Sequence, residues 1–363
     1  GEPRLALRRD GVEVFCRFTV TDTTLTEGDR PAVTVTAEDA EQQVALTWTM
    51  ELDPSGLLRQ RAAIRNLAYG ELEIGKVELG FAVPGWATEI LTTTGHHLRE
   101  RSPQRQPLTI GRFQRTYVAG RPDFDASLLL TVGAPGFGFE HGEVYSTHVA
   151  WSGNSLLSAE RLPYTQPVIG GGEILFGAYE TPWVYGAYGD GLNEVASRFH
   201  RYVRSCHPEM AIKPRPVILN TWEAVYFDQN YDTLVALADK AADSGVERFV
   251  VDDGWFGSRR DDTSGLGDWQ IAQSVWPEGP KSLKALADYV HGKGMQFGLW
   301  FEPEMVNPDS EMFRNHPDWV LKPTANRLPM QGRCQQVVDL TNPEAYDYVY
   351  DCMDKLVEEL GID

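Results

Sequence analysis

The sequence predicts a multidomain protein of the β plus α/β class, in which an N-terminal antiparallel β-sandwich is followed by an incomplete (β/α)8 TIM barrel. Three observations predict this class. Short alternating strands fill residues 1–205, and strands alternate with helices over residues 217–363. The chain of 363 residues is also roughly two to three times as long as the commonest domain.

Residues 1–205 are predicted to be the sandwich domain, whose start we expect to be truncated. β-branched and aromatic residues alternate with polar ones, as in residues 44–50, and Gly, Pro or Asp interrupt these runs about every dozen residues. Apolar residues at helical spacing predict an exit helix over residues 191–204. The prolines within residues 213–216 favour an extended linker, which we place at residues 206–216.

Residues 217–363 are predicted to be the first half of a catalytic (β/α)8 barrel, C-terminally truncated. Strands are expected at residues 217–220, 248–251 and 296–300, helices at 231–242, 281–292 and 343–360, and a short run at 336–340 is left open as a further barrel strand. A doubly wound sheet would alternate in the same way, but no Gly-x-Gly-x-x-Gly motif follows a strand to support nucleotide binding. A complete barrel needs about 250 residues, so only part of one is expected here.

The composition excludes several classes of partner. Acidic residues outnumber basic residues by 52 to 33, and the net charge of −19 repels phosphate backbones and anionic lipids, so neither nucleic acid nor a membrane is an expected partner. No apolar run reaches the ~18 residues of a membrane span, and the first residues contain no signal core. The four cysteines are far apart, which predicts no disulfide framework and no metal site, and favours a cytoplasmic location.

Two adjacent carboxylates, Asp252 and Asp253, directly follow a predicted apolar strand, and Gly254 permits a sharp turn behind them. Polar groups at the carboxyl ends of parallel strands are typical of a barrel active site. The alternative is that they cap a helix or solvate a loop. Since paired carboxylates accept hydrogen bonds from neighbouring hydroxyls, a sugar is the expected ligand.

Tryptophans surround this region and have two interpretations. A pyranose stacks its apolar face on an indole ring, but large aromatics also fill cores, and the sequence does not separate these roles for Trp255, Trp269, Trp300 and Trp319. Trp222 lies beyond the end of its predicted strand, so we expect it at the rim of the site.

Three further charged residues are candidates near the same strand ends. Glu302 and Glu304 follow the third predicted strand and are suited to general acid or base chemistry, or else to buried ion pairs with Arg or Lys. Arg333 lies in a predicted loop, where it contacts the ligand or is simply solvated.

In the identity and order of several motifs, the sequence resembles the bacterial and fungal α-galactosidases of glycoside hydrolase family 36. The motifs are Asn220-Thr221-Trp222-Glu223-Ala224, Asp252-Asp253-Gly254-Trp255-Phe256-Gly257, Leu266-Gly267-Asp268-Trp269, Leu299-Trp300-Phe301-Glu302-Pro303-Glu304, His316-Pro317-Asp318-Trp319 and Gly332-Arg333-Cys334-Gln335. Together they span about 120 residues in a fixed order, which makes the resemblance specific.

The resemblance implies hydrolysis of terminal α-galactosyl residues, as in melibiose, raffinose and stachyose, with retention and without a metal or cofactor. It implies that Asp252 and Asp253 hold the galactosyl hydroxyls. Trp222 would line the same pocket and Arg333 would contact it. The catalytic nucleophile and acid/base are expected after Asp363, so no catalytic residue is expected within this chain, which should be inactive alone. Because members of this family form tetramers, the resemblance implies that the full-length protein is a homo-oligomer.

Two alternatives stay open. One is a non-catalytic module that binds galactosides or is purely structural, and the other is a different α-glycosidase of the same barrel clan. For the enzyme, we expect Asp253→Asn to cost far more activity than Asp268→Asn, which serves as the comparison.

Overall fold

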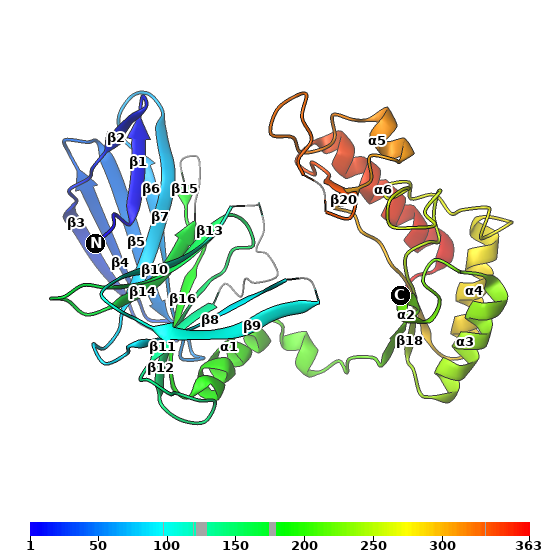
Figure 1. The fold of residues 1–363 in the computed structure, drawn as a ribbon, viewed down its shortest axis with the longest axis horizontal. Coiled ribbons are helices and arrows are strands. Elements are labelled where there is room, and N and C mark those ends of the chain that lie inside the picture. Colours follow the sequence, from blue (N-terminus) through cyan, green and yellow to red (C-terminus); the bar gives the residue numbers. More distant parts are fainter. Residues whose placement is uncertain (97, 119, 121–128, 174–178, 331) are drawn as a thin grey trace. The chain divides into compact units, whose positions relative to one another are not determined.

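The computed structural model describes residues 1–96, 98–118, 120, 129–173, 179–330 and 332–363. The chain forms two units, Gly1–Ile212 and Lys213–Asp363 (Figure 1). Within the described ranges, no helix is both long enough and apolar enough to cross a membrane.

The described residues of the first unit form two antiparallel sheets. Among the described residues, the smaller sheet has the strand order β10 (Gly111–Tyr117), β13 (Ser155–Arg161), β14 (Val168–Glu173), β7 (Leu72–Ala82), β1 (Leu5–Arg9) and β2 (Val12–Val14). The larger sheet has the order β3 (Thr19–Thr26), β4 (Ala32–Asp39), β5 (Val44–Leu52), β6 (Leu58–Asn66), β16 (Val184–Asp190), β12 (Glu143–Val149), β11 (Leu129–Gly133), β8 (Glu89–His96) and β9 (Arg99–Pro107), and β15 (Tyr179–Glu180) pairs with β6. The predicted antiparallel β structure of this half is confirmed.

Apolar side chains from both sheets pack together between them. Leu157 on β13 and Ile169 on β14 share one buried cluster with Leu130 on β11 and Val184 on β16. Because the side chains of a strand alternate between its two faces, each sheet contributes one apolar face to this core.

Helix α1 (Leu192–Cys206) covers the opposite face of the larger sheet. Its Val195 packs in a buried cluster with Tyr185 and Ala187 of β16, and the hydroxyls of Tyr185 and Tyr202 lie 2.7 Å apart. The segment predicted as a linker after it contains a short 3-10 helix, Pro208–Ala211.

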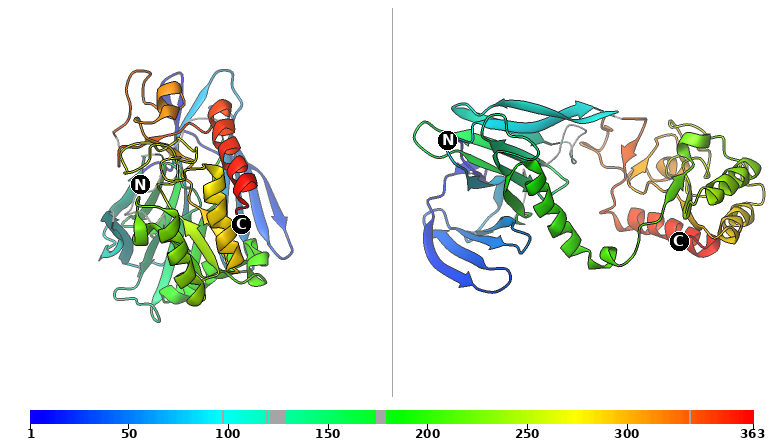
Figure 2. Two further views of the ribbon diagram at one scale, coloured as in Figure 1. Left: turned by 90° about the vertical axis from the view of Figure 1, so that its right-hand side faces the viewer. Right: turned by 90° about the horizontal axis from the view of Figure 1, so that it is seen from below.

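The second unit contains a parallel sheet in the order β17 (Ile218–Asn220), β18 (Arg248–Val251) and β19 (Gln296–Leu299). The helices that accompany it are α2 (Trp222–Val225), α3 (Tyr231–Asp243), α4 (Pro280–Gly292), α5 (Glu311–Asn315) and α6 (Pro343–Leu360). Helices α3, α4 and α6 lie side by side against one face of the sheet (Figure 1, Figure 2). In-order parallel strands joined through helices are the βα units that the sequence predicted.

The run at 336–340, left open as a barrel strand, belongs to a different sheet. Its residues Gln336–Val337 form β21, which pairs antiparallel with β20 (Met305–Val306). These two short strands lie in the segments that follow β19, so they shape the loops around the strand ends.

The long helix α6 begins and ends on residues suited to those positions. The Asn342 side chain accepts a hydrogen bond from the Glu344 amide, Pro343 occupies the first turn, and Gly361 has a φ of 69° at the C-cap. The chain then returns to the sheet, where the Asp363 amide donates to the Phe297 carbonyl of β19 at 3.1 Å.

Candidate functional site

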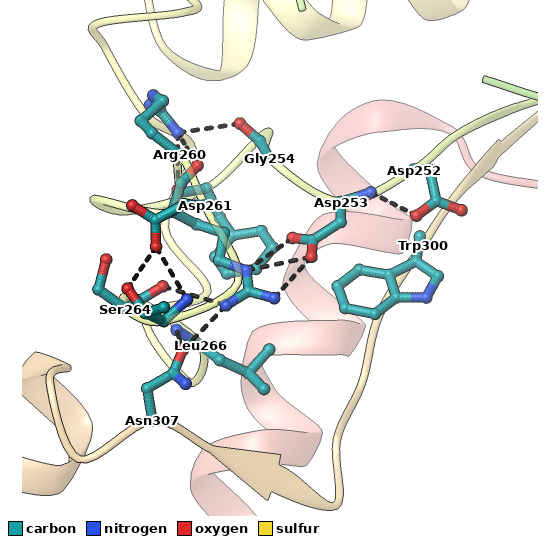
Figure 3. Close-up of polar contacts among 12 residues, drawn as sticks. Asp252, Asp253, Gly254, Arg260, Asp261, Ser264, Leu266, Trp300 and Asn307 are labelled. Atoms are coloured by element: carbon teal, nitrogen blue, oxygen red, sulfur yellow. Dashed lines mark hydrogen bonds and ion pairs between the residues drawn. The ribbon is translucent and has the colours of Figure 1, made fainter. Parts of the chain in front are cut away.

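The register of the parallel sheet brings three strand ends to one edge. Asn220 pairs with Val250, and Val251 pairs with Leu299, so the residues that follow these strands are neighbours. The Trp300 amide donates to the Val251 carbonyl at 2.8 Å. Figure 3 shows Asp252 and Trp300 at this edge. The sequence therefore placed its main candidates at one edge of the sheet correctly.

Asp252 is fixed by groups from the neighbouring strand and from its own loop. The Asn220 side-chain amide donates to its Oδ2, and the Asp253 amide donates to its Oδ1 at 2.7 Å. The Asn220 Oδ1 also accepts from the Trp222 amide at 2.8 Å, which ties Trp222 to the same group. Each oxygen of Asp252 keeps further acceptor capacity, because a carboxylate has about four lone-pair positions.

Asp253 forms a buried ion pair with Arg259. Arg259 Nε donates to Oδ1 at 3.0 Å and to Oδ2 at 3.1 Å, and Nη2 donates to Oδ2 at 2.7 Å. Asp253 is 3% exposed and Arg259 is 0% exposed. Burial raises the pKa of the Asp253 carboxyl, and the hydrogen bonds and charge of Arg259 act against that shift. Gly254 follows at a φ of 112°, which is the sharp turn that the sequence predicted.

Asn307 connects this ion pair to the loop that carries Arg333. Its Oδ1 accepts from Arg259 Nη1 and from the Leu266 amide, both at 2.9 Å (Figure 3). Its Nδ2 donates to the Cys334 carbonyl at 2.8 Å. Sequence reasoning missed Arg259 and Asn307. The sequence contains one signal, a cation six residues after Asp253 in the same loop. The sequence leaves a buried ion pair open for Glu302 and Glu304, whereas the structure forms it at Asp253.

Those carboxylates, Glu302 and Glu304, form no ion pair with any residue in the described part of the chain. Glu302 is half-buried and Glu304 is exposed. Burial, and then the charge of Glu304, raises the pKa of Glu302, while Arg333 lowers it. Arg333 is exposed, and its charge also acts to lower the pKa of Asp253, so it lies within electrostatic range of both groups.

The tryptophans divide between the two interpretations. Trp255, Trp269 and Trp319 are buried in clusters and belong to the core. Trp222 and Trp300 are half-buried. The ring of Trp222 meets Phe227 edge to face, with their centroids 5.0 Å apart, which fixes its orientation beyond the strand end.

Asp268→Asn is not a suitable control for Asp253→Asn, because the Asp268 side chain has a structural role. It is buried, and its carboxylate accepts hydrogen bonds from the amides of Glu311 at 3.0 Å and Met312 at 2.9 Å, at the start of α5. The first amides of a helix have no partner inside the helix, so Asp268 satisfies two of them. The sequence does not predict this contact, because a Gly-Asp-Trp segment gives no sign of the helix whose first amides it meets.

The first unit contains a cavity of about 460 Å³ between α1 and the larger sheet, lined among others by Leu91, Leu129, Val195 and Phe199. Its described lining is largely apolar and includes no carboxylate. The acid pair of the second unit is therefore the better candidate for a hydroxyl-rich ligand.

Comparison with known proteins identifies the class. The family model described as Melibiase matches residues 178–363, and the model described as Glycosyl hydrolase family 36 N-terminal domain matches residues 1–180. The antiparallel sheets and the βα units with their acid pair are those of a glycoside hydrolase. The chain belongs to the α-galactosidases of glycoside hydrolase family 36.

Individual relatives agree. An α-galactosidase of Escherichia coli is 38% identical over 361 residues, which cover 96% of this chain and 50% of that protein. The α-galactosidase AgaA of Geobacillus stearothermophilus is 35% identical over 276 residues, which cover 73% of this chain and 37% of that protein. The chain thus spans half or less of the length of these two relatives.

Solved structures give the same result. The crystal structure of AgaA matches with a TM-score of 0.90 at 27% identity, over 100% of this chain and 54% of that chain. Variants of AgaA in complex with raffinose and with stachyose match with TM-scores of 0.90 at 26% and 27% identity, again over 100% of this chain and 54% of theirs.

Proposed function

We propose that this chain supplies the galactose-binding wall of an α-galactosidase that hydrolyses terminal α-galactosyl residues of melibiose- and raffinose-type sugars. One observation carries the proposal: Asp252 and Asp253 are held rigidly at the ends of parallel strands, with acceptor capacity left on their oxygens. The raffinose and stachyose complexes of AgaA variants support this substrate class.

The chemistry of the four candidate binding residues suits a sugar. Asp252 and Asp253 accept hydrogen bonds from two neighbouring hydroxyls, and a charged acceptor makes such bonds stronger than a neutral one does. Trp222 offers a half-buried aromatic surface for the apolar face of the ring. Arg333 supplies only donors, so it would bond to hydroxyl oxygens.

We also propose that the parallel sheet is the beginning of a (β/α)8 barrel. The support is the in-order strands β17, β18 and β19, with α3, α4 and α6 gathered on one face. The return of the chain to β19 after α6 follows the same βα pattern. On this proposal, residues 1–205 are the sandwich domain, residues 206–216 the linker and residues 217–363 the first half of the catalytic barrel.

For the reaction, we propose a retaining mechanism with two carboxylates, one acting as nucleophile and the other as acid/base. Neither carboxylate is assigned within these 363 residues. Asp253 is engaged by the Arg259 guanidinium, which stabilises its charged form and favours binding of hydroxyls over attack on carbon. Glu302 and Glu304 are reserve candidates that the assay below tests.

The full-length gene product should cleave p-nitrophenyl α-galactoside much faster than p-nitrophenyl α-glucoside, and proton NMR should show the α-anomer of galactose formed first. A β-anomer formed first contradicts the retaining mechanism. The 363 residues expressed alone should show no turnover. Turnover by a monodisperse preparation of them would instead assign the catalytic pair to this chain, with Glu302 and Glu304 as the first residues to replace.

Binding without hydrolysis is the second candidate function, because the groups that fix Asp252 and Asp253 all belong to this chain. Galactose binding by a full-length gene product that cleaves no α-galactoside would favour it.

A further inference from the structure

Each nitrogen of the buried Arg259 guanidinium donates a hydrogen bond. Nε and Nη2 bond to Asp253, and Nη1 donates to Asn307 Oδ1 at 2.9 Å and to the Ser264 carbonyl at 3.2 Å. With 0% of its surface exposed, Arg259 cannot itself contact a bound sugar. An arginine in such a place acts on the ligand through the groups that it holds.

Asn307 connects Arg259 to the loop that carries Arg333. It is fully buried, and its amide donates to the Cys334 carbonyl at 2.8 Å. Arg333 and Cys334 have φ values of 54° and 55°, and two successive non-glycine residues in the left-handed region are unfavourable unless their surroundings hold them there. The bond from Asn307 is one contact that holds this turn, and the turn sets where the Arg333 side chain begins.

We propose that Arg259 and Asn307 form a positioning relay, which holds the Asp253 carboxylate and the Arg333 turn in one fixed arrangement for galactose. This inference rests on the proposed function, because it assumes that Asp253 and Arg333 contact the sugar. Neither member of the relay touches the ligand, so both are positioning residues. Through Asn307, which directly follows β20, the relay joins the loop after β18 to the loop that precedes β21.

Arg259 also favours the charged form of Asp253. The charged groups that face Asp253 are Asp252 in its own loop, Arg259, Arg333 in the loop that precedes β21, and Glu302 after β19. Burial and the charge of Asp252 both raise the pKa of Asp253, while Arg259 acts most strongly to lower it. Without Arg259 the pKa of Asp253 should rise further, and galactose affinity should then fall as the pH is lowered through that higher value.

The test uses the full-length gene product and measures KM for p-nitrophenyl α-galactoside and Kd for galactose over about pH 4 to 8, where a raised carboxyl pKa is visible. Arg259→Gln should raise both constants by at least ~10-fold, since it removes a charge-assisted bond from the binding carboxylate. It should also move the acid limb of the pH profile, where affinity falls at low pH, to higher pH. Arg259→Lys keeps the charge but not the fork of donors, so it should restore the acid limb while recovering only part of the affinity.

Arg260→Gln is the matched control. Arg260 lies in the same loop and bonds to the Gly254 carbonyl at 3.0 Å and the Ser274 hydroxyl at 2.7 Å, but it makes no bond to the Asp253 carboxylate. It should change KM by less than ~3-fold and leave the acid limb in place, as expected of a change that affects only the packing of the loop. Equal effects of Arg259→Gln and Arg260→Gln would overturn the proposal.

Two double-mutant comparisons test whether Arg259 acts through Asp253 and whether Asn307 acts through Arg333. In an Asp253→Asn background, Arg259→Gln should add less than ~3-fold to the loss, and Asn307→Ala should behave in the same way in an Arg333→Ala background. Additive losses in both comparisons would refute the relay. If the single Arg259→Gln variant does not fold, the Asp253→Asn/Arg259→Gln variant, which buries no unpaired charge, still gives the comparison with Asp253→Asn.

The proposed function and the relay fail in different ways. A wild-type gene product that neither binds galactose nor cleaves α-galactosides contradicts the proposed function. The relay fails alone when the wild-type product binds galactose and Arg259→Gln changes KM, Kd and their pH dependence no more than Arg260→Gln does.

Discussion

Asp253→Asn is the substitution that probes the proposed site most directly, because it exchanges a charged acceptor for a neutral amide at almost constant volume. A hydrogen bond to a charged group is worth about 1.5–3 kcal/mol, so the loss of one such bond to a sugar hydroxyl should lower kcat/KM roughly 10- to 100-fold. If two hydroxyls bond to this carboxylate, the two losses combine. The expected fall in the full-length gene product is thus between about 10-fold and 10⁴-fold.

The same substitution also affects folding. It leaves the buried guanidinium of Arg259 without its carboxylate, and removal of one partner of a buried pair costs about 3–5 kcal/mol. Thermal unfolding should therefore be measured beside activity, and the assay run well below the lower of the two melting temperatures. Isothermal titration with galactose then reports binding by the folded variant alone.

The control for Asp253→Asn is Asp262→Asn, in the same loop and exposed, in place of Asp268, which caps a helix. Asp262→Asn removes the same charge and should leave both affinity and stability nearly unchanged. If the two variants differed by less than about twofold in kcat/KM, Asp253 would have no special part in recognition.

Three other predictions follow from buried or paired side chains. Asp268→Ala should lower the free energy of unfolding by ~2 kcal/mol, because it removes the acceptor for two amides at the start of α5; denaturant unfolding measures this. The hydrogen bond from Lys293 lowers the pKa of Asp239, so its stabilisation is present above about pH 4 and is lost as the pH falls below that value; Asp239→Asn should flatten this part of the curve of melting temperature against pH. Iodoacetamide should label exposed Cys334 before Cys352, whose thiol pKa is raised by burial, as peptide mass spectrometry can show.

The placement of Asp252 and Asp253 was predictable because it depends on two short-range facts. An apolar β-branched run predicts the strand, and the topology of βα units brings the ends of successive strands to one edge. Nothing beyond the order of elements is needed to bring Trp222 and Trp300 to the same edge. The position of these residues at one edge of the sheet is therefore confirmed, and their binding of a ligand stays a prediction.

The partners of these residues were not predictable in the same way. Asn307 lies 48 residues from Arg259, and the segment between β18 and α4 is irregular, so no periodicity indicates which cation meets which carboxylate. The amino-acid types alone made Glu302 and Glu304 equally good partners for an arginine. Burial decides between these choices, and burial at Arg259 comes from the packing of several loops at once.

The proposed function makes sugar recognition and bond cleavage separable in this arrangement. The hydrogen bonds that fix Asp252 and Asp253 come from Asn220, Gln229 and Arg259, all within Lys213–Asp363, and the link to the Arg333 turn comes from Asn307 in the same unit. A carboxylate that is held by buried donors in the free protein loses little conformational freedom when a sugar binds. The entropy cost of ordering its side chain falls on folding and not on binding. Since none of these donors is a carboxylate, the proposed function predicts that changes to the relay appear first in affinity and its pH dependence, and changes to the catalytic carboxylates first in turnover.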